Sequence, residues 1–240
     1  MAKYVISDIH GEYDMFLEML DKIGLKDSDE LYVLGDVVDR GPHPLKILLK
    51  MMEMPNVVPI VGNHELMALD GLKFLNSKIT NETIASVNAE TLGNLLAWQE
   101  SGSAATIAEF RTLDARTREE ILEYIPEFSM FEEVEAGGKD YLLVHAGLGN
   151  YRPDKDILDY SLRDIAWSAA DYGTRYFDNI FVVTGHTPTQ FIAANPKPGY
   201  IYKANNHIAI DCGASFNGGR LAAIRLDDGA EFYVERGKND

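Results

Sequence analysis

The sequence predicts an α/β fold with a mostly parallel sheet, and three observations support this prediction. Apolar, β-branched runs alternate with amphipathic helical patterns through the first third of the chain. Five apolar runs end in a short polar motif, as strands do when their carboxyl ends face a binding crevice. A length of 240 residues is enough for one sizeable core.

The first third supplies three strands and two helices. The expected strands cover residues 3–7, 31–34 and 57–61, and the expected helices cover residues 13–23 and 45–54. Gly24 ends the first helix and Pro55 stops the second, because glycine takes a left-handed backbone easily and proline cannot continue a helix. Strands joined by helices in this order pair in parallel.

Residues from roughly 66 to 130 carry helical patterns instead, with breaks near Asn76, Gly102 and Pro126. We interpret this stretch as a helical insertion packed beside the sheet. No linker rich in proline, glycine or serine flanks it, so we expect residues 1–240 to form a single domain.

The carboxy-terminal part returns to strands. They are expected at residues 141–144, 180–184, 207–210, 220–226 and 231–234. Glycine-rich turns at residues 217–219 and 227–229 are interpreted as hairpin turns, which makes this end of the chain antiparallel.

Composition argues against several classes of function. A formal net charge of −16 is unfavourable for binding nucleic acid, which needs clustered Lys and Arg. No apolar run approaches the roughly 18 residues of a membrane span, so we expect no membrane partner. The single cysteine, Cys212, can form neither an internal disulfide nor a thiolate metal site. The amino terminus shows no export signal, and we expect a cytoplasmic protein.

The polar motifs at the strand ends carry the chemistry. They are Ser7–Gly11, Gly35–Gly41, Gly62–Glu65, His145–Gly147 and Gly185–Thr187. Carboxylate, imidazole and amide side chains of this kind suit Mn, Fe or Zn ions. One carboxylate can bridge two ions, and Asp36 is the natural candidate for that position. The sequence therefore predicts a metal site in one crevice.

Each motif has a plainer interpretation when it is taken alone. An isolated Asp-x-His pair such as Asp8 and His10 is more often a surface turn. His145 and His186 could each be a hydrogen-bonded core histidine. Together and in this order, the motifs are very hard to explain as structure alone. The remaining histidines lie outside these motifs, and we expect a solvated His43 and a structural His207.

In order, the motifs resemble those of the PPP family of serine/threonine protein phosphatases, within the calcineurin-like metallophosphoesterases. The similarity is greatest to the small bacterial and phage members, and it covers residues 4–65 and 141–226. This resemblance implies an αββα sandwich of two mixed sheets flanked by helices. The segment Trp98–Ile107 also resembles a helical segment of the bacterial members, with Ser101-Gly102-Ser103 where Asn-Gly-Gly is usual.

The resemblance further implies a centre of two divalent ions, with Mn²⁺ expected and Fe or Zn as alternatives. One ion would be bound by Asp8, His10 and Asp36, and the other by Asp36, Asn63, His145 and His186. A hydroxide between the ions would attack phosphorus in line. His64 resembles the general acid, Asp39 the carboxylate that orients it, and Arg40 a phosphate-binding arginine.

Two positions depart from the family pattern. Ser7 stands where glycine is usual, and we expect little effect because this position is not a metal ligand. The second phosphate-binding arginine is missing from the segment that follows His145–Gly147. Arg163, Arg152 or Arg175 could replace it in space. A solvent-facing cation on a helix is the more common role for Arg163.

The implied function is hydrolysis of phosphate monoesters, with phosphoserine and phosphothreonine proteins as the expected substrates. A diadenosine tetraphosphatase that cleaves a phosphoanhydride shares the same motifs and stays an alternative. A non-catalytic phosphate-binding module is the third, although all six ligand positions are filled. The sequence leaves open the native metals, the oligomeric state, the regulation and the preference among phosphoserine, phosphotyrosine and dinucleotide substrates.

Overall fold

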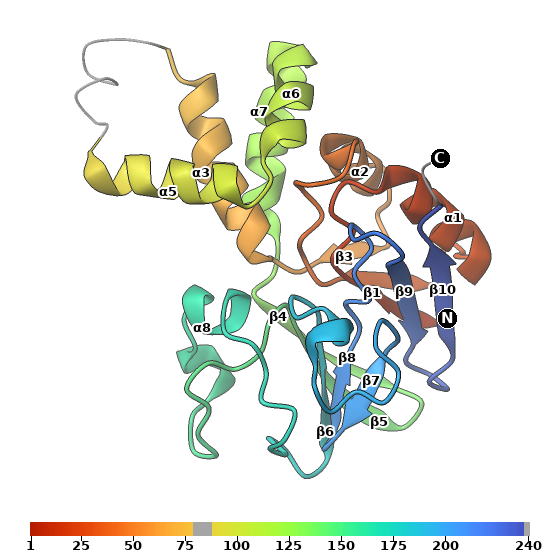
Figure 1. Cartoon of the computed structure of the whole chain (residues 1–240). Coiled ribbons are helices and arrows are strands. Elements are labelled where there is room, and N and C mark those ends of the chain that lie inside the picture. The colour runs from red at the N-terminus through yellow and green to blue at the C-terminus, as the bar shows by residue number, and fades with distance from the viewer. Residues whose placement is uncertain (79–87, 238–240) are drawn as a thin grey trace.

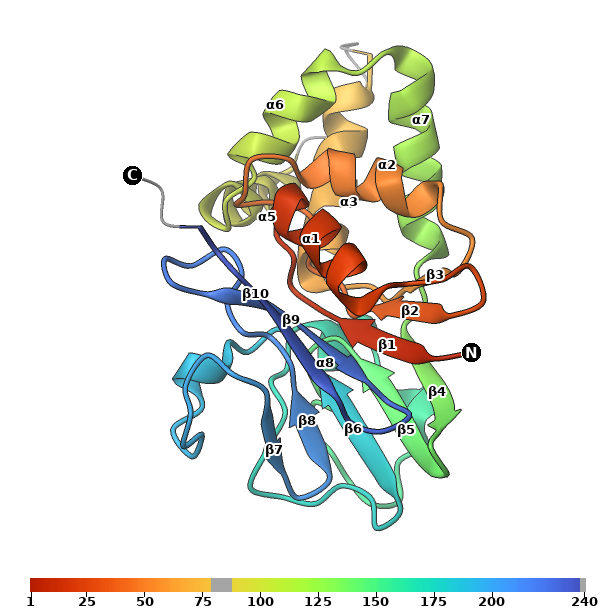
Figure 2. The same ribbon diagram turned by 90° about the vertical axis from the view of Figure 1, so that its right-hand side faces the viewer.

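The computed structural model, which describes residues 1–78 and 88–237, consists of two stacked β-sheets with helices on their outer faces (Figures 1 and 2). The predicted αββα sandwich of two mixed sheets is thus confirmed. In both sheets the parallel strands end at the same side of the molecule, where the polar motifs follow.

The first sheet has the strand order β10-β9-β1-β2-β3. Its strands are β1 (Lys3–Ile6), β2 (Glu30–Val33), β3 (Val57–Pro59), β9 (Arg220–Arg225) and β10 (Glu231–Glu235). The pairs β1–β2 and β2–β3 are parallel, as the strand–helix–strand order predicts. The pairs β1–β9 and β9–β10 are antiparallel, and the turn at residues 227–229 is the predicted hairpin.

The second sheet has the order β4-β5-β6-β8-β7. Its strands are β4 (Phe131–Ala136), β5 (Lys139–Val144), β6 (Ile180–Thr184), β7 (Tyr202–Ala204) and β8 (His207–Ala209). The three central strands, β5, β6 and β8, are parallel to one another. The edge strands β4 and β7 are antiparallel to their neighbours.

Alternating side chains divide each sheet between two cores. In β1, Val5 points between the sheets, while Tyr4 and Ile6 point towards the helices. In β5, Leu143 faces the core between the sheets and Leu142 faces the other side. This period of two is what a strand buried on both faces requires.

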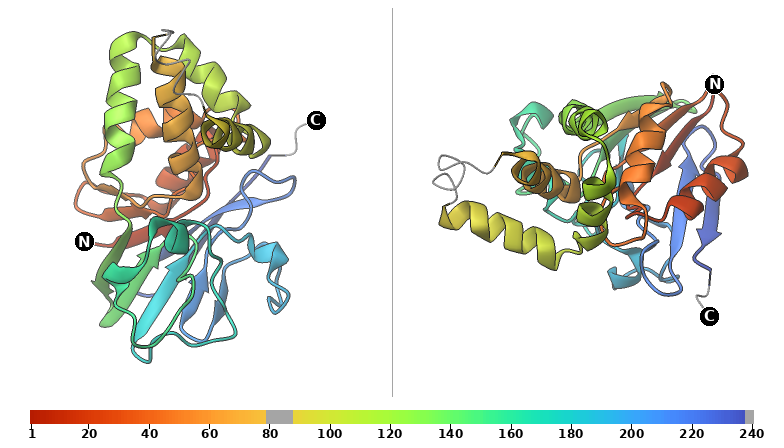
Figure 3. Two further views of the ribbon diagram at one scale, coloured as in Figure 1. Left: turned by 90° about the vertical axis from the view of Figure 1, so that its left-hand side faces the viewer. Right: turned by 90° about the horizontal axis from the view of Figure 1, so that it is seen from above.

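Helices cover the outer faces and build the insertion. They are α1 (Tyr13–Ile23), α2 (Pro44–Met52), α3 (Asn63–Asn76), α5 (Ala89–Glu100), α6 (Ala104–Thr112), α7 (Ala115–Tyr124) and α8 (Leu162–Ala166), with short 3₁₀ helices at Ile157–Asp159, Thr189–Phe191 and, after α7, Ile125–Glu127. The helices α1, α2 and α3 pack on the first sheet. Seen from above, α5 projects away from the sheets (Figure 3).

The predicted helical insertion is confirmed where it is described, and residues 79–87 of it lie outside the described residues. Its first helix, α3, begins at Asn63 instead of residue 66, so the third strand-end motif forms the first turn of a helix. Within residues 1–78 and 88–237, no helix is both long enough and apolar enough to cross a membrane.

Two details of the sequence-based prediction were wrong or incomplete. The turn at residues 217–219 is no hairpin, because it connects β8 of one sheet to β9 of the other. Strands β4 and β7 were not predicted. Both are sheet edges, where a strand needs fewer apolar residues, and half of the residues of β4 are glutamates.

Candidate metal centre

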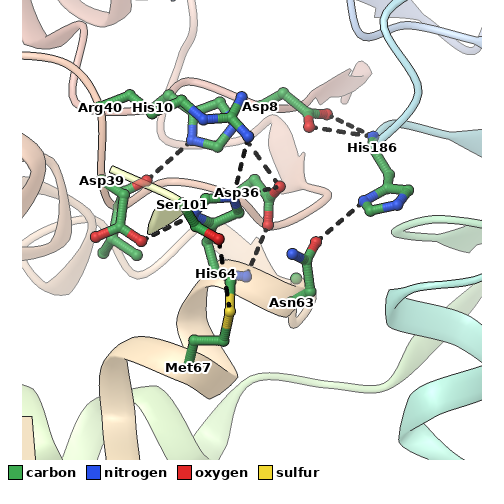
Figure 4. Close-up of polar contacts among 12 residues, drawn as sticks. Asp8, His10, Asp36, Asp39, Arg40, Asn63, His64, Met67, Ser101 and His186 are labelled. Carbon is green, nitrogen blue, oxygen red and sulfur yellow. Dashed lines mark hydrogen bonds and ion pairs between the residues drawn. The ribbon is translucent and has the colours of Figure 1, made fainter. Parts of the chain in front are cut away.

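The five predicted motifs converge at the carboxyl ends of the parallel strands of both sheets. Figure 4 labels residues from four of them. Backbone hydrogen bonds tie the loops together. The amide of Asp8 donates to the carbonyl of Gly35 at 3.1 Å, and the amide of His10 donates to that of Asp36 at 2.9 Å. In the second sheet, the amide of Gly185 donates to the carbonyl of His145 at 2.7 Å. The convergence predicted from the strand ends is therefore present.

Asp36 lies at the middle of the cluster. Its carboxylate belongs to two groups of potential ligands, one with His10 and His64 and the other with His145 and His186. The Nε2 atom of His145 is 3.3 Å from Oδ1 of Asp36, and the Nε2 atom of His10 is 3.7 Å from Oδ2. A carboxylate shared by two groups of ligands is the arrangement that a bridging residue needs.

Asn63 completes the side of the cluster formed by the second sheet. Its Oδ1 atom lies 3.1 Å from Nε2 of His145 and 3.0 Å from Nδ1 of His186. Figure 4 shows Asn63 and His186 pointing towards each other from α3 and from the loop after β6. Three ligand-type atoms from three elements thus meet at one point.

Asp8 lies beside the cluster, turned towards the loop after β6. Its carboxylate accepts the backbone amide of His186 at 2.9 and 3.1 Å, and the hydroxyl of Ser7 donates to it. His64, not Asp8, is the third member of the group around His10 and Asp36. The contact between Ser7 and Asp8 had not been foreseen, and the small effect expected for Ser7 stays a prediction.

Three carboxylates crowd this space, and Asp211 had not been predicted among them. Burial raises the pKa of Asp8 to about 7, and the charge of Asp36 adds to the rise. Burial, with Asp8 and Asp36 nearby, also raises the pKa of Asp211 well above its usual range. Asp36 itself is buried, yet His145 and His64 hold its pKa well below its usual range. A positive ion would relieve this crowding.

The imidazoles of His10 and His145 provide a test of whether these residues fit a metal. The Nδ1 atom of His10 is 3.0 Å from the carbonyl of Val38, and that of His145 is 2.5 Å from the carbonyl of Leu34. Carbonyls only accept, so Nδ1 carries the hydrogen and Nε2 of a neutral ring presents a lone pair towards Asp36. Burial lowers the pKa of His10 to about 3, which keeps its ring neutral. A lone pair facing a carboxylate fits a cation between them.

The rings of His186 and His145 differ in charge. Burial, followed by the neighbouring His145, lowers the pKa of His186 to about 4. The pKa of His145 is raised to about 10 although burial opposes this, because Asp36 and Asp8 favour its cationic form. A metal ion would take the place of that proton, since metal ligation requires a neutral imidazole.

The backbone at the site adopts conformations that non-glycine residues rarely take. Positive φ angles occur at Asp8, His10, Asp36, Asp39, Arg40 and His186. Such residues typically cost about 1–3 kcal/mol each and cluster at functional sites. Gly62 also has a steric reason to be glycine, because a Cβ there would lie 2.3 Å from Oδ1 of Asp36.

Glu65 holds the loop that carries Asp36. This fully buried carboxylate accepts the backbone amides of Asp36 at 2.8 Å, Val37 at 2.8 Å, Val38 at 3.2 Å and Gly62 at 3.0 Å. Burial and the charge of Asp36 raise its pKa, while these amides act in the opposite direction. The sequence places Glu65 in a motif, but its role in fixing another loop could not be predicted.

His64 is held next to the cluster by Asp39. Its Nδ1 atom is 2.7 Å from Oδ2 of Asp39, and its Nε2 atom is 3.1 Å from a guanidinium nitrogen of Arg40. Against the effect of burial, Asp36 and Asp39 raise the pKa of His64. The three residues predicted to be catalytic are thus in mutual contact, with Nε2 of His64 directed towards Asp36 at 3.9 Å.

Arg163 lies near the cluster without contacting it. The exposed Arg163 lines a cavity of about 380 Å³ together with Met67 and Trp167, and Met67 is one helical turn beyond His64. Within residues 1–78 and 88–237, no hydrogen bond or ion pair joins its guanidinium to a predicted site residue. Two other arginines were considered as replacements for the missing phosphate-binding arginine. Nε of Arg152 lies 4.0 Å from Oδ1 of Asp154 at the surface, and Arg175 is exposed.

The two histidines outside the motifs have structural contacts. His207 is buried, with Nε2 at 2.9 Å from the carbonyl of Thr174 and its ring against Tyr176, as expected for a structural residue. His43 is only half-exposed, and its ring lies 3.0 Å from Glu109, so it is less solvated than predicted.

Known proteins with similar sequences include a nucleotide-cleaving tetraphosphatase and a protein phosphatase. A symmetrical bis(5'-nucleosyl)-tetraphosphatase of Acidovorax ebreus (strain TPSY) is 32% identical over 150 residues, which cover 62% of this chain and 44% of that protein. The chain therefore spans less than half the length of that relative. Serine/threonine-protein phosphatase 2 of Salmonella typhimurium (strain LT2) is 28% identical over 231 residues, covering 93% of this chain and 92% of that protein.

Comparisons of fold and family agree with the geometry. A solved structure provisionally identified as a diadenosine tetraphosphatase superposes with a TM-score of 0.68 at 16% identity, covering 99% of this chain and 95% of that one. This similarity shows a shared fold. The family model for calcineurin-like phosphoesterases matches residues 1–212. The chain therefore belongs to the calcineurin-like phosphoesterase family.

Proposed function

We propose that this protein is a metal-dependent phosphomonoesterase whose substrates are proteins phosphorylated on serine or threonine. The observation that carries the proposal is the contact chain Asp39–His64–Arg40 beside the carboxylate of Asp36. It combines an oriented proton donor with a phosphate-binding cation next to a cluster of metal ligands. The Salmonella relative, which aligns over nearly all of both chains, supports the choice of substrate.

Six residues would hold two divalent cations. Asp8, His10 and Asp36 would bind one, and Asp36, Asn63, His145 and His186 would bind the other. Bound there, the ions supply Lewis-acid activation of water and of phosphate oxygens. The oxygen and nitrogen donors suit Mn²⁺, with Fe or Zn as alternatives, because no thiolate is present among them.

Arg40 provides the cationic group for the substrate. Arg40 is an exposed residue with a fixed backbone: its φ is 67°, and its amide donates to the carbonyl of Gly102 at 2.9 Å. A guanidinium binds two phosphate oxygens at once through its planar fork of N–H groups. Arg163, which lines the neighbouring cavity, is the candidate for a second phosphate contact.

His64 protonates the leaving group. A serine alkoxide is a poor leaving group, so its oxygen must gain a proton as the bond to phosphorus breaks. In the structure Arg40, which can only donate, faces the lone pair of Nε2, while Nδ1–H donates to Asp39. Once Arg40 turns to bind phosphate, Nε2 takes up the proton that is transferred to the leaving oxygen. The negative charge of Asp39 stabilises this imidazolium and holds the ring in place.

A second candidate function is cleavage of a dinucleoside polyphosphate. The similarity to the Acidovorax tetraphosphatase supports it, and the cavity lined by Trp167 and Arg163 offers an aromatic ring and a cation. Both reactions use the same cluster of ligands. A non-catalytic phosphate-binding module is disfavoured, because all six ligand positions, His64 and Asp39 keep their functional side chains.

A turnover panel with Mn²⁺ separates the candidates. We expect kcat/KM for a phosphoserine peptide to exceed that for diadenosine tetraphosphate by at least about tenfold. A phosphotyrosine peptide of the same sequence shows whether the preference extends to aryl esters. Asp36→Asn is the inactive control for all three. A reversed ratio of phosphopeptide to dinucleotide would refute the proposed substrate class.

Several expectations stay predictions. They are the single domain spanning residues 1–240, the cytoplasmic location and the absence of nucleic-acid and membrane partners. The substrate itself is the partner that we propose, as a phosphorylated protein or a small phosphoester.

A further inference from the structure

The carboxylate of Asp39 is held by two side chains from the helical insertion as well as by His64. The indole Nε1–H of Trp98, on α5, donates to Oδ2 at 2.9 Å and to Oδ1 at 3.2 Å. The hydroxyl of Thr106, on α6, donates to Oδ1 at 2.6 Å. Asp39 and Thr106 are fully buried, and Trp98 and His64 are each only 2% exposed.

These contacts leave the carboxylate no freedom to turn. Each of its oxygens has two donors: Oδ1 is shared by Thr106 and Trp98, and Oδ2 by His64 and Trp98. Thr106 also accepts the backbone amide of Asp39 at 3.0 Å, so one hydroxyl fixes both the main chain and the side chain. A buried carboxylate that lost such donors would be unsatisfied and would have to move or gain a proton.

The same insertion holds the strained turn that contains Asp39. Asp39 and Arg40 have φ angles of 69° and 67°, which side chains with a Cβ rarely adopt. The amide of Arg40 donates to the carbonyl of Gly102, which lies between α5 and α6. The segment from Trp98 to Thr106 therefore contacts both Asp39 and Arg40, whose side chains contact His64.

The position of the indole is set by α3, the helix that carries His64 in its first turn. The ring of Trp98 lies directly against Gly71, where an added Cβ would be 2.1 Å from the ring atom Cζ3. Gly71 therefore leaves space for the indole next to Asp39. Movement of α5 relative to α3 would be transmitted to the carboxylate through this contact.

We propose that Trp98 and Thr106 are positioning residues for proton transfer, which act by holding Asp39 and, through it, the ring of His64. The proposal rests on the proposed function, in which His64 protonates the leaving oxygen. It gives the helical insertion a role in catalysis, because α5 and α6 supply groups that orient the acid through Asp39.

Two conservative substitutions test the proposal. Trp98→Phe keeps an aromatic ring and removes the N–H, and Thr106→Val keeps the shape and removes the hydroxyl. We expect each to slow hydrolysis of a phosphoserine peptide by about 10- to 100-fold in kcat, as is usual when a supporting hydrogen bond is lost. Hydrolysis of p-nitrophenyl phosphate should fall by less than about threefold, because its phenolate leaves without a proton. Metal content should not change.

A matched control separates positioning from folding. Phe110 is a buried core residue of α6, the helix that carries Thr106. Phe110→Leu should affect the two substrates equally, whatever it does to stability. If Trp98→Phe does not fold, Thr106→Val still gives the comparison between the two substrates. Equal losses for the two substrates in Thr106→Val would overturn the proposal.

The decisive readout combines each substitution with His64→Asn. If Trp98 and Thr106 act only through His64, neither should slow phosphoserine hydrolysis further in the His64→Asn background. A further loss of tenfold in that background would also overturn the proposal. If His64→Asn alone slows both substrates equally, then the acid role of His64 fails. If His64→Asn slows phosphoserine hydrolysis more than p-nitrophenyl phosphate hydrolysis, but Trp98→Phe and Thr106→Val slow both equally, then only the positioning role fails.

Discussion

Glu65→Gln should destabilise the protein more than any other isosteric change at the site, because four backbone amides depend on its carboxylate. The amides of Asp36 and Gly62 point to Oε2, and those of Val37 and Val38 point to Oε1. Glutamine replaces one oxygen by an NH₂ group, so two amides would face a donor. Two hydrogen bonds to a charged group are worth about 3–6 kcal/mol together.

The net loss should be smaller than that sum. The neutral amide avoids burying a charge, and burial is the main reason why the pKa of Glu65 is raised. We therefore expect the free energy of unfolding to fall by about 2–4 kcal/mol, or roughly 4–16 °C in Tm for a chain of this length. Metal affinity should fall by about 10- to 100-fold, because the loop that carries Asp36 loses its support.

Urea unfolding of metal-free protein measures the first effect, and metal titration measures the second. Glu53→Gln is the control, since Glu53 is exposed and pairs with Lys50 at the surface. That control should change stability by less than about 0.5 kcal/mol. If Glu65→Gln were as stable as Glu53→Gln, the proposed role of Glu65 in fixing the loop would be refuted.

Three further predictions concern the substrate, the steric fit and the pH dependence. Arg40→Ala should reduce kcat/KM by a factor corresponding to about 1.5–3 kcal/mol. This loss should exceed that of Arg163→Ala, because of these two arginines it is Arg40 that contacts His64. Steady-state kinetics of both variants measure the two losses, and a larger loss in Arg163→Ala would contradict the prediction. Gly62→Ala should abolish metal binding, because the added Cβ would displace Asp36; metal analysis measures this. Gly93→Ala is the matched change in α5, where the added Cβ meets open space, and urea unfolding should show a gain in stability of about 0.5–1 kcal/mol. The carboxylate of Asp29 accepts hydrogen bonds from the backbone amides of Ala2 and Lys26, which lower its pKa, so Asp29 stabilises the fold above its unfolded-state pKa and loses this effect as pH falls through its folded-state pKa. In urea unfolding, Asp29→Asn should therefore lower the free energy of unfolding by about 1–2 kcal/mol at pH 7 and by less at pH 2.5. An equal loss at both pH values would contradict this prediction.

The strand-end pattern predicted most of the site because it rests on a general property of parallel sheets. A polar residue directly after a buried strand lies at the crevice, whatever the rest of the fold does. The same reasoning applied to the strand at residues 207–210 would have pointed to Asp211, which follows it. Asp211 was missed because Asp-Cys-Gly has neither the histidine that four of the five motifs contain nor the second aspartate and the arginine of Gly35–Gly41.

Contacts between distant segments could not be predicted in this way. Trp98 and Thr106 lie 59 and 67 residues from Asp39 in the sequence, and their segment was predicted only to be helical, with a resemblance to a helical segment of the bacterial members. Their side chains reach the carboxylate because α5 and α6 pack against α3, which is a property of tertiary packing. Edge strand β4 was not predicted for a related reason: it forms by pairing with β5, although half of its residues are glutamates.

Metal stoichiometry, measured together with turnover, tests the central claim most directly. The protein would be stripped with a chelator and titrated with Mn²⁺, while bound metal and phosphoserine-peptide hydrolysis are followed in parallel. We predict about two ions per chain, no turnover without metal, and recovery that follows occupancy. Asp36→Asn, which removes the shared carboxylate, should bind fewer than two ions per chain. Full turnover after exhaustive chelation, or unchanged metal binding by Asp36→Asn, would contradict the account.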